Sequence, residues 1–316
     1  MIVFKRIAGW IAFIAGLTVL LLTASCIVVP KDNTWQAGME ESRANGILGE
    51  PSDTIDVLFL GDSEAHTMIS PLLLWKQTGI PAYTCGTDSQ KLTYSLTMLE
   101  RALENQKPKL VILETLAIYR TITPGDVVTS TLSHTFPVFQ YHNRWKSLTL
   151  QDFTMKTAAT GRSAYKGHHP NQNIVPAESK EYMQPTKDQA EIAKTNQIYV
   201  REIQKRCQRS GAKLLLVSSP SPINWNYSRH NGIQALADEL GCEYIDLNLQ
   251  NEKLKIDWTQ DTYDKGDHLN HFGAVKVTEY LGAYLQKTGL FQDRRQDDAF
   301  QEWNRQLAEY EAALQK

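Results

Sequence analysis

The residues best suited to chemistry in this chain are a serine and a histidine that stand far apart in the sequence. Ser63 lies in the GDSE segment 61–64, directly after the apolar run 57–60. His268 lies in the segment 264–270, which reads DKGDHLN. A serine hydroxyl is a weak nucleophile until a neighbouring base takes its proton, and a third group must hold that base. The chain contains all three parts in the order Ser, Asp, His, which predicts nucleophilic acyl chemistry.

Two carboxylates compete to orient His268. Asp267 is directly adjacent to His268 in the chain, and adjacent side chains rarely face each other. Asp264 needs a loop that turns back toward His268, and the intervening Gly266 tolerates unusual backbone angles. We therefore expect Asp264 to hold the imidazole, with Asp267 as the alternative. His271 is an alternative base, although we expect it to face outward from a helix start.

These motifs resemble those of the SGNH/GDSL hydrolase superfamily, in which a GDS-type turn follows the first strand and Asp and His lie close together near the C-terminus. The likeness extends to four stretches and is greatest to the membrane-anchored branch of the superfamily. That branch includes the SGNH-like proteins of alginate acetylation and the D-alanyl transfer protein of teichoic acid modification. The stretches span residues 57–75, 82–90, 107–115 and 264–274.

Acyl transfer also needs hydrogen-bond donors for the oxyanion that develops on the substrate. The backbone N–H of Ser63 is one candidate. The resemblance implies Gly86 as the second, because it matches the glycine of the superfamily's second block. The third donor of the superfamily, the Asn of a GxND pattern, is missing, since residues 113–115 read Leu-Glu-Thr. Gln90 or a residue of a cap is the candidate substitute.

Polar and aromatic residues near the motifs, or clustered further along the chain, are candidates for substrate binding. Aromatic faces beside polar donors suit sugar rings. The candidates are Glu64, His66, His142, Arg144 and Trp145. The pair His168 and His169 has no carboxylate at ligand spacing, so we predict neither a metal site nor a cofactor.

The order of apolar runs and amphipathic segments predicts the elements that must position these residues. Strand-like runs alternate with helical patterns, which predicts a parallel sheet with helices on both faces and its site at the carboxyl ends of the strands. Together with the resemblance, this gives a three-layer α/β/α, flavodoxin-like fold. Strands are expected at residues 55–60, 81–85, 109–113, 213–217 and 242–247.

Three segments are expected after an N-terminal segment at residues 1–30. A catalytic domain at 55–290 contains an insertion at about 120–188, where Thr, Ser, His and Pro interrupt the alternation. Loops of this length are usually functional or disordered, and we expect a cap over the active site with helix around 138–148. Residues 31–54 are expected to form a linker. Residues 291–316 are expected to form an amphipathic helix that packs on the domain or docks a partner.

The uncharged run at 7–29 is long enough to span a bilayer core of ~30 Å as a helix. Lys5 and Arg6 precede it, which favours a cytoplasmic N-terminus for a transmembrane segment at 1–30, with the remainder outside the cell. A cleaved signal peptide, or lipid attachment at Cys26, are the alternatives. The net charge is −2, and nothing in the sequence points to nucleic acid.

These observations favour a single-pass membrane enzyme of the cell envelope. We expect an SGNH-type O-acyltransferase, most simply an O-acetyltransferase, or an esterase, acting on an extracellular polysaccharide through a Ser-His-Asp acyl-enzyme. The resemblance implies a membrane-bound O-acyltransferase as partner. The alternatives are D-alanyl transfer to teichoic acid and a non-catalytic glycan-binding scaffold. The missing GxND block and the unusual Asp spacing favour the scaffold modestly.

Overall fold

The computed structural model describes residues 2–154, 156–178 and 181–315, and it divides the chain into two compact units. The N-terminal unit comprises Met1–Glu40 and Thr123–Gly161. The sheet unit comprises Glu41–Ile122 and Arg162–Lys316. Both the expected linker at 31–54 and the expected cap at 120–188 are therefore divided between the two units.

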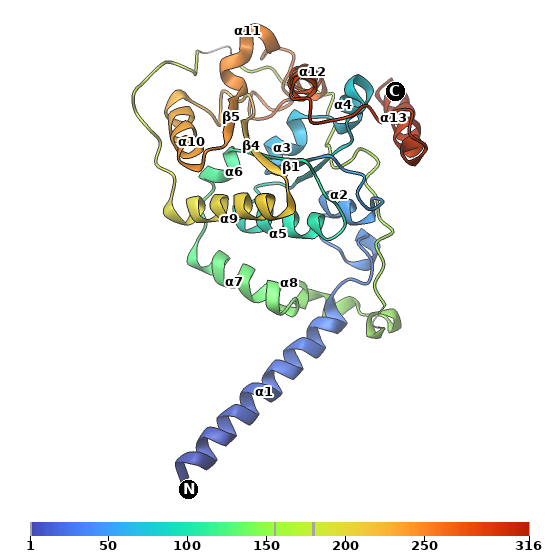
Figure 1. Cartoon of the computed structure of the whole chain (residues 1–316), viewed down its shortest axis with the longest axis vertical. Helices are drawn as coiled ribbons and strands as arrows, with labels where there is room; N and C mark the ends of the chain where they lie inside the picture. Colours follow the sequence, from blue (N-terminus) through green and yellow to red (C-terminus); the bar gives the residue numbers. More distant parts are fainter. Residues whose placement is uncertain (1, 155, 179–180, 316) are drawn as a thin grey trace. The chain divides into compact units, whose positions relative to one another are not determined.

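The sheet unit is built on a five-stranded parallel sheet in the order β2-β1-β3-β4-β5. This is the flavodoxin-like order, which confirms the expected fold class. Figure 1 labels β1, β4 and β5 of this sheet. The strand interiors are nearly all aliphatic because both faces of the sheet are covered. The strands are β1 (Val57–Gly61), β2 (Ala82–Gly86), β3 (Leu110–Glu114), β4 (Lys213–Ser218) and β5 (Glu243–Asp246).

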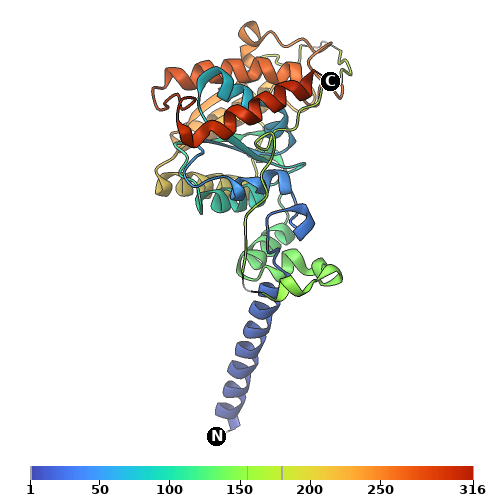
Figure 2. The same cartoon turned by 90° about the vertical axis from the view of Figure 1, so that its right-hand side faces the viewer.

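Helices cover both faces of the sheet (Figures 1 and 2). On one face lie α5 (Leu92–Leu103) and α9 (Lys194–Ser210); on the other lie α4 (Pro71–Thr78), α12 (His271–Lys287) and α13 (Gln301–Leu314). The remaining helical segments of the unit are α2 (Ser42–Asn45), η2 (Gly46–Gly49), α3 (Ser63–Met68), α6 (Leu116–Tyr119), α10 (Tyr227–Leu240), η5 (Leu247–Gln250), α11 (Asn251–Leu254) and η6 (Asp298–Phe300).

The C-terminal segment is part of the sheet unit. The Trp75 ring of α4 lies 5.7 Å from the Phe300 ring and 5.3 Å from the Trp303 ring, measured between centroids. All three side chains are buried. The apolar stripe of α13 therefore serves packing on the domain, which was one of the two expected roles.

A short segment from the expected cap is fixed to the edge of the sheet. The backbone N–H of Thr84 in β2 donates to the Lys166 carbonyl at 2.9 Å. The fully buried Lys166 ammonium donates to both carboxylate oxygens of Glu50, at 2.9 and 2.7 Å. Gly167 has φ +84, and a Cβ there would lie 1.9 Å from the Thr84 carbonyl oxygen, so only glycine fits. This packing covers the edge of β2 and fixes the position of His168.

The N-terminal unit is a long helix with short helices at its C-terminal end. α1 (Ile2–Val28) is long and apolar enough to cross a membrane, a test that a signal sequence would also pass. The backbone N–H of Val138 donates to Ser25 Oγ at 3.1 Å, and Arg144 Nη1 donates to the Val28 carbonyl at 2.6 Å. The short elements are η1 (Trp35–Ala37), α7 (Pro124–Thr135), α8 (Val138–Tyr141), η3 (His142–Ser147) and η4 (Leu150–Phe153).

Candidate active site

The turn between β1 and α3 presents Ser63 at the carboxyl end of the sheet. Gly61 has φ +150, and a Cβ there would lie 2.7 Å from Glu114 Cβ, so the turn requires glycine. Asp62 caps α3, because its Oδ1 accepts from the Glu64 backbone N–H at 3.0 Å. Its other oxygen accepts from Arg120 Nε at 2.6 Å. Ser63 is thus the first residue of a short helix, and both carboxylate oxygens of its N-cap residue Asp62 accept hydrogen bonds.

A loop before α12 carries the histidine and both candidate acids. Thr262 and Leu269 form an antiparallel bridge that closes this loop. Gly266 has φ +91, as the returning loop requires. Ser221, in the loop after β4, has its hydroxyl oxygen 2.8 Å from the Asp267 carbonyl and 3.0 Å from the Gly266 carbonyl. The histidine loop is therefore attached to the loop of a neighbouring strand.

The structure brings Ser63, His268 and Asp264 into one chain of hydrogen bonds. His268 Nε2 lies 2.7 Å from Ser63 Oγ, and His268 Nδ1 lies 2.6 Å from Asp264 Oδ2. The other Asp264 oxygen accepts from the His268 backbone N–H at 2.7 Å. Asp267 Oδ2 is 3.8 Å from Nδ1, outside hydrogen-bond distance. Asp264 therefore orients the ring, and Asp267 contributes only its charge.

Carboxyl groups around His268 change its pKa. Burial lowers this pKa, but the hydrogen bond to Asp264 and the charges of Glu64, Asp267 and Asp264 outweigh burial and raise it to about 9. Burial alone would raise the pKa of Asp264, yet its hydrogen bonds with His268 lower it. The pair is thus a carboxylate and an imidazolium in the free protein at neutral pH.

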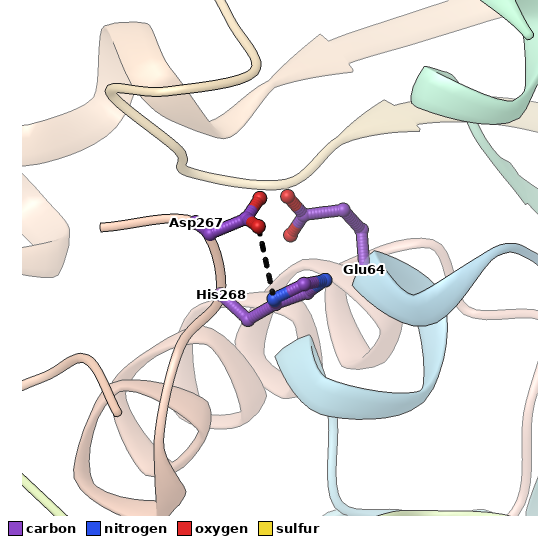
Figure 3. A group of neighbouring side chains, drawn as sticks. All are labelled: Glu64, Asp267 and His268. Atoms are coloured by element: carbon purple, nitrogen blue, oxygen red, sulfur yellow. Dashed lines mark ion pairs between the residues drawn. The ribbon is translucent and has the colours of Figure 1, made fainter. Parts of the chain in front are cut away.

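The Glu64 side chain is buried beside the histidine loop, the loop before α12 that carries His268. Figure 3 shows its carboxyl group and that of Asp267 pointing toward each other above the His268 ring. Asn224 Nδ2 joins them, with distances of 2.9 Å to Glu64 Oε1 and 2.5 Å to Asp267 Oδ1. Burial raises the pKa of Glu64 to about 8, against the opposing charge of His268. At neutral pH Glu64 is therefore mostly protonated.

One group of side chains has the residue types and the spacing of a metal site. It consists of Glu64, Asp267 and His268, whose ligand atoms all lie within 4.8 Å of one another. Both ring nitrogens of His268 already have partners, in Ser63 and Asp264. The carboxyl groups of Glu64 and Asp267 share Asn224 as a donor. This arrangement suits proton transfer better than metal binding.

His66 occupies a buried position on the other side of α3. Its Nε2 lies 2.9 Å from Asp88 Oδ1. Its backbone carbonyl accepts from the His169 backbone N–H at 2.9 Å and lies 2.9 Å from His168 Nδ1. Burial lowers the pKa of His66 to about 3, as does the nearby Arg43, whereas the Asp88 hydrogen bond opposes this shift. His66 is therefore neutral at physiological pH, and its role in substrate binding stays a prediction.

The candidate oxyanion donors differ in how they are engaged. A Cβ on Gly86 would lie 2.8 Å from the Asp62 carbonyl oxygen, so Gly86 lies directly against the turn that carries Ser63. Gln90 does not suit the role: its Nε2 already donates to the Cys85 carbonyl and to Ser95 Oγ, and its Oε1 accepts from Thr87. The prediction that Gln90 supplies a donor is therefore wrong, because its amide is used inside the β2–α5 connection.

The remaining predicted residues lie elsewhere. His142, Arg144 and Trp145 belong to the N-terminal unit, where Arg144 binds the Val28 carbonyl and Asp152. Their role in substrate binding stays a prediction. His271 begins α12, and its Nδ1 lies 3.3 Å from the Tyr310 hydroxyl. The His271 side chain therefore contacts Tyr310 of α13.

Sequence reasoning missed three residues of the site. Asn224 joins Glu64 to Asp267, Arg120 pairs with Asp62 at 2.6 Å, and the Tyr263 ring stacks on His268 at 5.7 Å between centroids. Each comes from a loop or a short helix end with no periodic pattern. Only knowledge of which loops meet at the carboxyl ends of the strands could have identified these three residues.

No family model and no curated protein matches the chain. Among solved structures it is similar to a psychrotrophic esterase from Pseudoalteromonas sp., with 13% identity, TM-score 0.39, and coverage of 75% of this chain and 100% of that one. It is also similar to an acetyl xylan esterase (17% identity, TM-score 0.38, coverage 73% and 100%). A third is a GDSL-like lipase from Bacteroides thetaiotaomicron (12% identity, TM-score 0.35, coverage 73% and 88%). Because these TM-scores are below 0.5, the function proposed below depends on the site geometry.

Proposed function

We propose that this protein is an SGNH-type serine enzyme that transfers or hydrolyses an O-acyl group, most simply acetyl, on a polysaccharide outside the cytoplasm. One observation carries the proposal: the continuous hydrogen-bonded chain from Ser63 through His268 to Asp264. Such a chain of nucleophile, base and orienting acid defines serine acyl chemistry by geometry and not by fold.

The first step starts from the fraction of the protein in which His268 is neutral. His268 Nε2 takes the proton of Ser63 Oγ while this oxygen attacks the acyl carbonyl. A C–O bond forms to Ser63, and the carbonyl oxygen becomes an oxyanion. The backbone N–H groups of Ser63 and Gly86 are the candidate donors to that oxyanion. The bond to the leaving alcohol then breaks, and His268 returns the proton to that alcohol. Asp264 holds the ring and stabilises the imidazolium throughout.

In the second step, an acceptor hydroxyl attacks the acyl group on Ser63. His268 takes the proton of the acceptor, the bond to Ser63 breaks, and the proton returns to Ser63 Oγ. A sugar hydroxyl as acceptor gives transfer, and water gives hydrolysis. The same residues serve both reactions, because only the attacking molecule differs.

The substrate class depends on the location of the sheet unit. α1 is long and apolar enough to span a membrane, and the basic residues Lys5 and Arg6 stand at its start. This supports a cytoplasmic N-terminus and an extracytoplasmic sheet unit. An envelope or secreted glycan is then the acceptor within reach, and a membrane-bound O-acyltransferase is the partner that would supply the acyl group.

The non-catalytic scaffold is the weaker candidate. Its support was the missing GxND block and the unusual Asp spacing. The spacing objection is answered by the loop geometry, since Asp264 accepts from both the ring and the backbone N–H of His268. A scaffold would have no need for a serine held 2.7 Å from an oriented imidazole.

A serine-directed fluorophosphonate probe tests the proposal on the full-length protein. The probe should label the wild type once and should fail to label Ser63→Ala, whereas the matched control Ser210→Ala should label normally. Turnover of p-nitrophenyl acetate should follow the same pattern. Adding an acceptor oligosaccharide distinguishes transfer from hydrolysis by the mass of the product. Absence of labelling in the folded wild type would favour the scaffold.

A further inference from the structure

The N-terminal unit exposes large apolar side chains on short helical segments. Leu150 is 90% exposed, and Trp145 and Phe153 are 65% and 61% exposed. Trp35 and Phe139 are exposed as well. Apolar side chains exposed singly need no explanation, but several gathered on a few short segments indicate an interaction site.

These segments are attached to the last turn of α1. α8 is joined to it by the hydrogen bond from the Val138 N–H to Ser25 Oγ. η3 is joined to it by Arg144, which donates to the Val28 carbonyl. Arg144 also donates to Asp152, and Asp152 caps η4 by accepting from the Thr149 backbone N–H at 2.7 Å. In both views the short helices gather around the C-terminal end of α1 (Figures 1 and 2).

The length of α1 sets the depth of this attachment in a bilayer. Its 27 residues rise about 40 Å at 1.5 Å per residue. A hydrocarbon core of ~30 Å therefore leaves the last turn of a spanning helix in the headgroup region. Trp and Tyr side chains are enriched at that depth, and Lys and Arg side chains can act as interfacial anchors. The unit carries Lys31 and Lys146 there, and the Lys146 ammonium lies 5.9 Å from the centre of the Trp145 ring.

We propose that residues 138–153 form a collar that inserts its exposed apolar side chains into the lipid interface around α1. This inference rests on the proposed membrane placement of α1. Lipid suits the surface better than a protein partner, because side chains as exposed as Leu150 protrude instead of lining a groove. A fluid interface accepts protruding apolar side chains without a complementary shape.

Spin labels on the full-length chain, reconstituted in vesicles of phosphatidylcholine and phosphatidylglycerol, test the collar. Cys26 and Cys242 are first changed to serine, because a spin label could react with these two partly or fully exposed cysteines. Cys85 and Cys207 are buried and can stay. Single cysteines then replace Leu150 and Phe153. Leu20→Cys in α1 serves as the lipid reference, and Gln208→Cys in α9 serves as the water reference. Each label is measured for collisions with oxygen, which concentrates in lipid, and with a water-soluble nickel chelate.

Labels at 150 and 153 should be several-fold more accessible to oxygen than to the nickel chelate, as at Leu20. High nickel accessibility at both positions, with the Leu20 label in lipid, would overturn the collar and leave the membrane placement intact. Low accessibility to both reagents would instead indicate cover by protein and would also overturn it. A Leu20 label in water would remove the membrane placement itself.

Discussion

Two histidine–aspartate pairs lie near Ser63, and they differ in almost every respect that matters for catalysis. His66 and Asp88 link α3 to the loop after β2, whereas His268 and Asp264 lie within the loop before α12. His66 is buried, while the Asp88 side chain is 85% exposed and most of its charge is solvated. His268 is only partly buried and is surrounded by the carboxyl groups of Asp264, Asp267 and Glu64.

The difference teaches that a hydrogen bond between His and Asp does not by itself make a base. For His66 the cost of burying a charge dominates, and its pKa falls to about 3. For His268 the surrounding carboxyl groups dominate, and its pKa rises to about 9. Of the two histidines, His268 has the pKa closer to physiological pH, and only its Nε2 lies within hydrogen-bond distance of Ser63 Oγ.

The largest effect should separate the two histidines. His268→Ala removes the base, and we expect kcat/KM for an acetyl ester to fall about 10⁴- to 10⁶-fold, as for the loss of a triad histidine. His66→Asn should lower it less than about 10-fold, because His66 shifts no proton in the reaction. Steady-state kinetics at pH 8 measures both, and thermal melting checks that each variant is folded. A comparable loss in a folded His66→Asn would contradict the distinction.

The second-largest change in activity should distinguish the two acids of the histidine loop, Asp264 and Asp267. Asp264→Asn breaks the hydrogen bond that fixes the His268 ring, and we expect a loss of about 10²- to 10⁴-fold in kcat. Asp267→Asn removes only a nearby charge and should cost less than about 10-fold. Both variants should keep the fold, as judged by circular dichroism. The reverse order of effects would assign the orienting role to Asp267.

The pH dependence should show the raised pKa of His268 directly. The base must be neutral to take the serine proton, so kcat/KM should rise with pH through a midpoint at about pH 9. Asp264→Asn removes the hydrogen bond that favours the imidazolium, so its rise should move to lower pH. Asp88→Asn is the matched control and should leave the midpoint unchanged. A wild-type midpoint near pH 6 would show that the carboxyl groups do not act on His268.

The smallest effect is expected at Glu64. Because burial keeps this carboxyl mostly protonated at pH 7, Glu64→Gln replaces one neutral group by another. The amide oxygen can still accept from Asn224, so kcat/KM at pH 7 should change less than about 3-fold. Above pH 8 the wild type gains a charge that the variant lacks, and the two pH profiles should separate. A large loss at pH 7 would mean that Glu64 acts as a carboxylate.

Local patterns predicted the architecture because each depends on residues close together in the chain. The aliphatic runs that became β1, β3 and β4 are buried on both faces of the sheet, and such runs are recognisable from composition alone. Ser63 was assigned to a strand-to-helix turn by the same local argument. The insertion was recognised from its composition, but its division between the two units depends on contacts that no local pattern records.

The sequence by itself determined the strand runs, the apolar N-terminal helix, and Ser63 and His268 as the candidate nucleophile and base, because apolar periodicity and turn chemistry act over a few neighbouring residues. Tertiary structure alone decided which carboxylate orients His268, that the Gln90 amide is already engaged, and that Asn224 joins two acids. These outcomes depend on loops from different strands that meet at the carboxyl ends of the strands. There, a difference of about an ångström separates a hydrogen bond from a nearby charge.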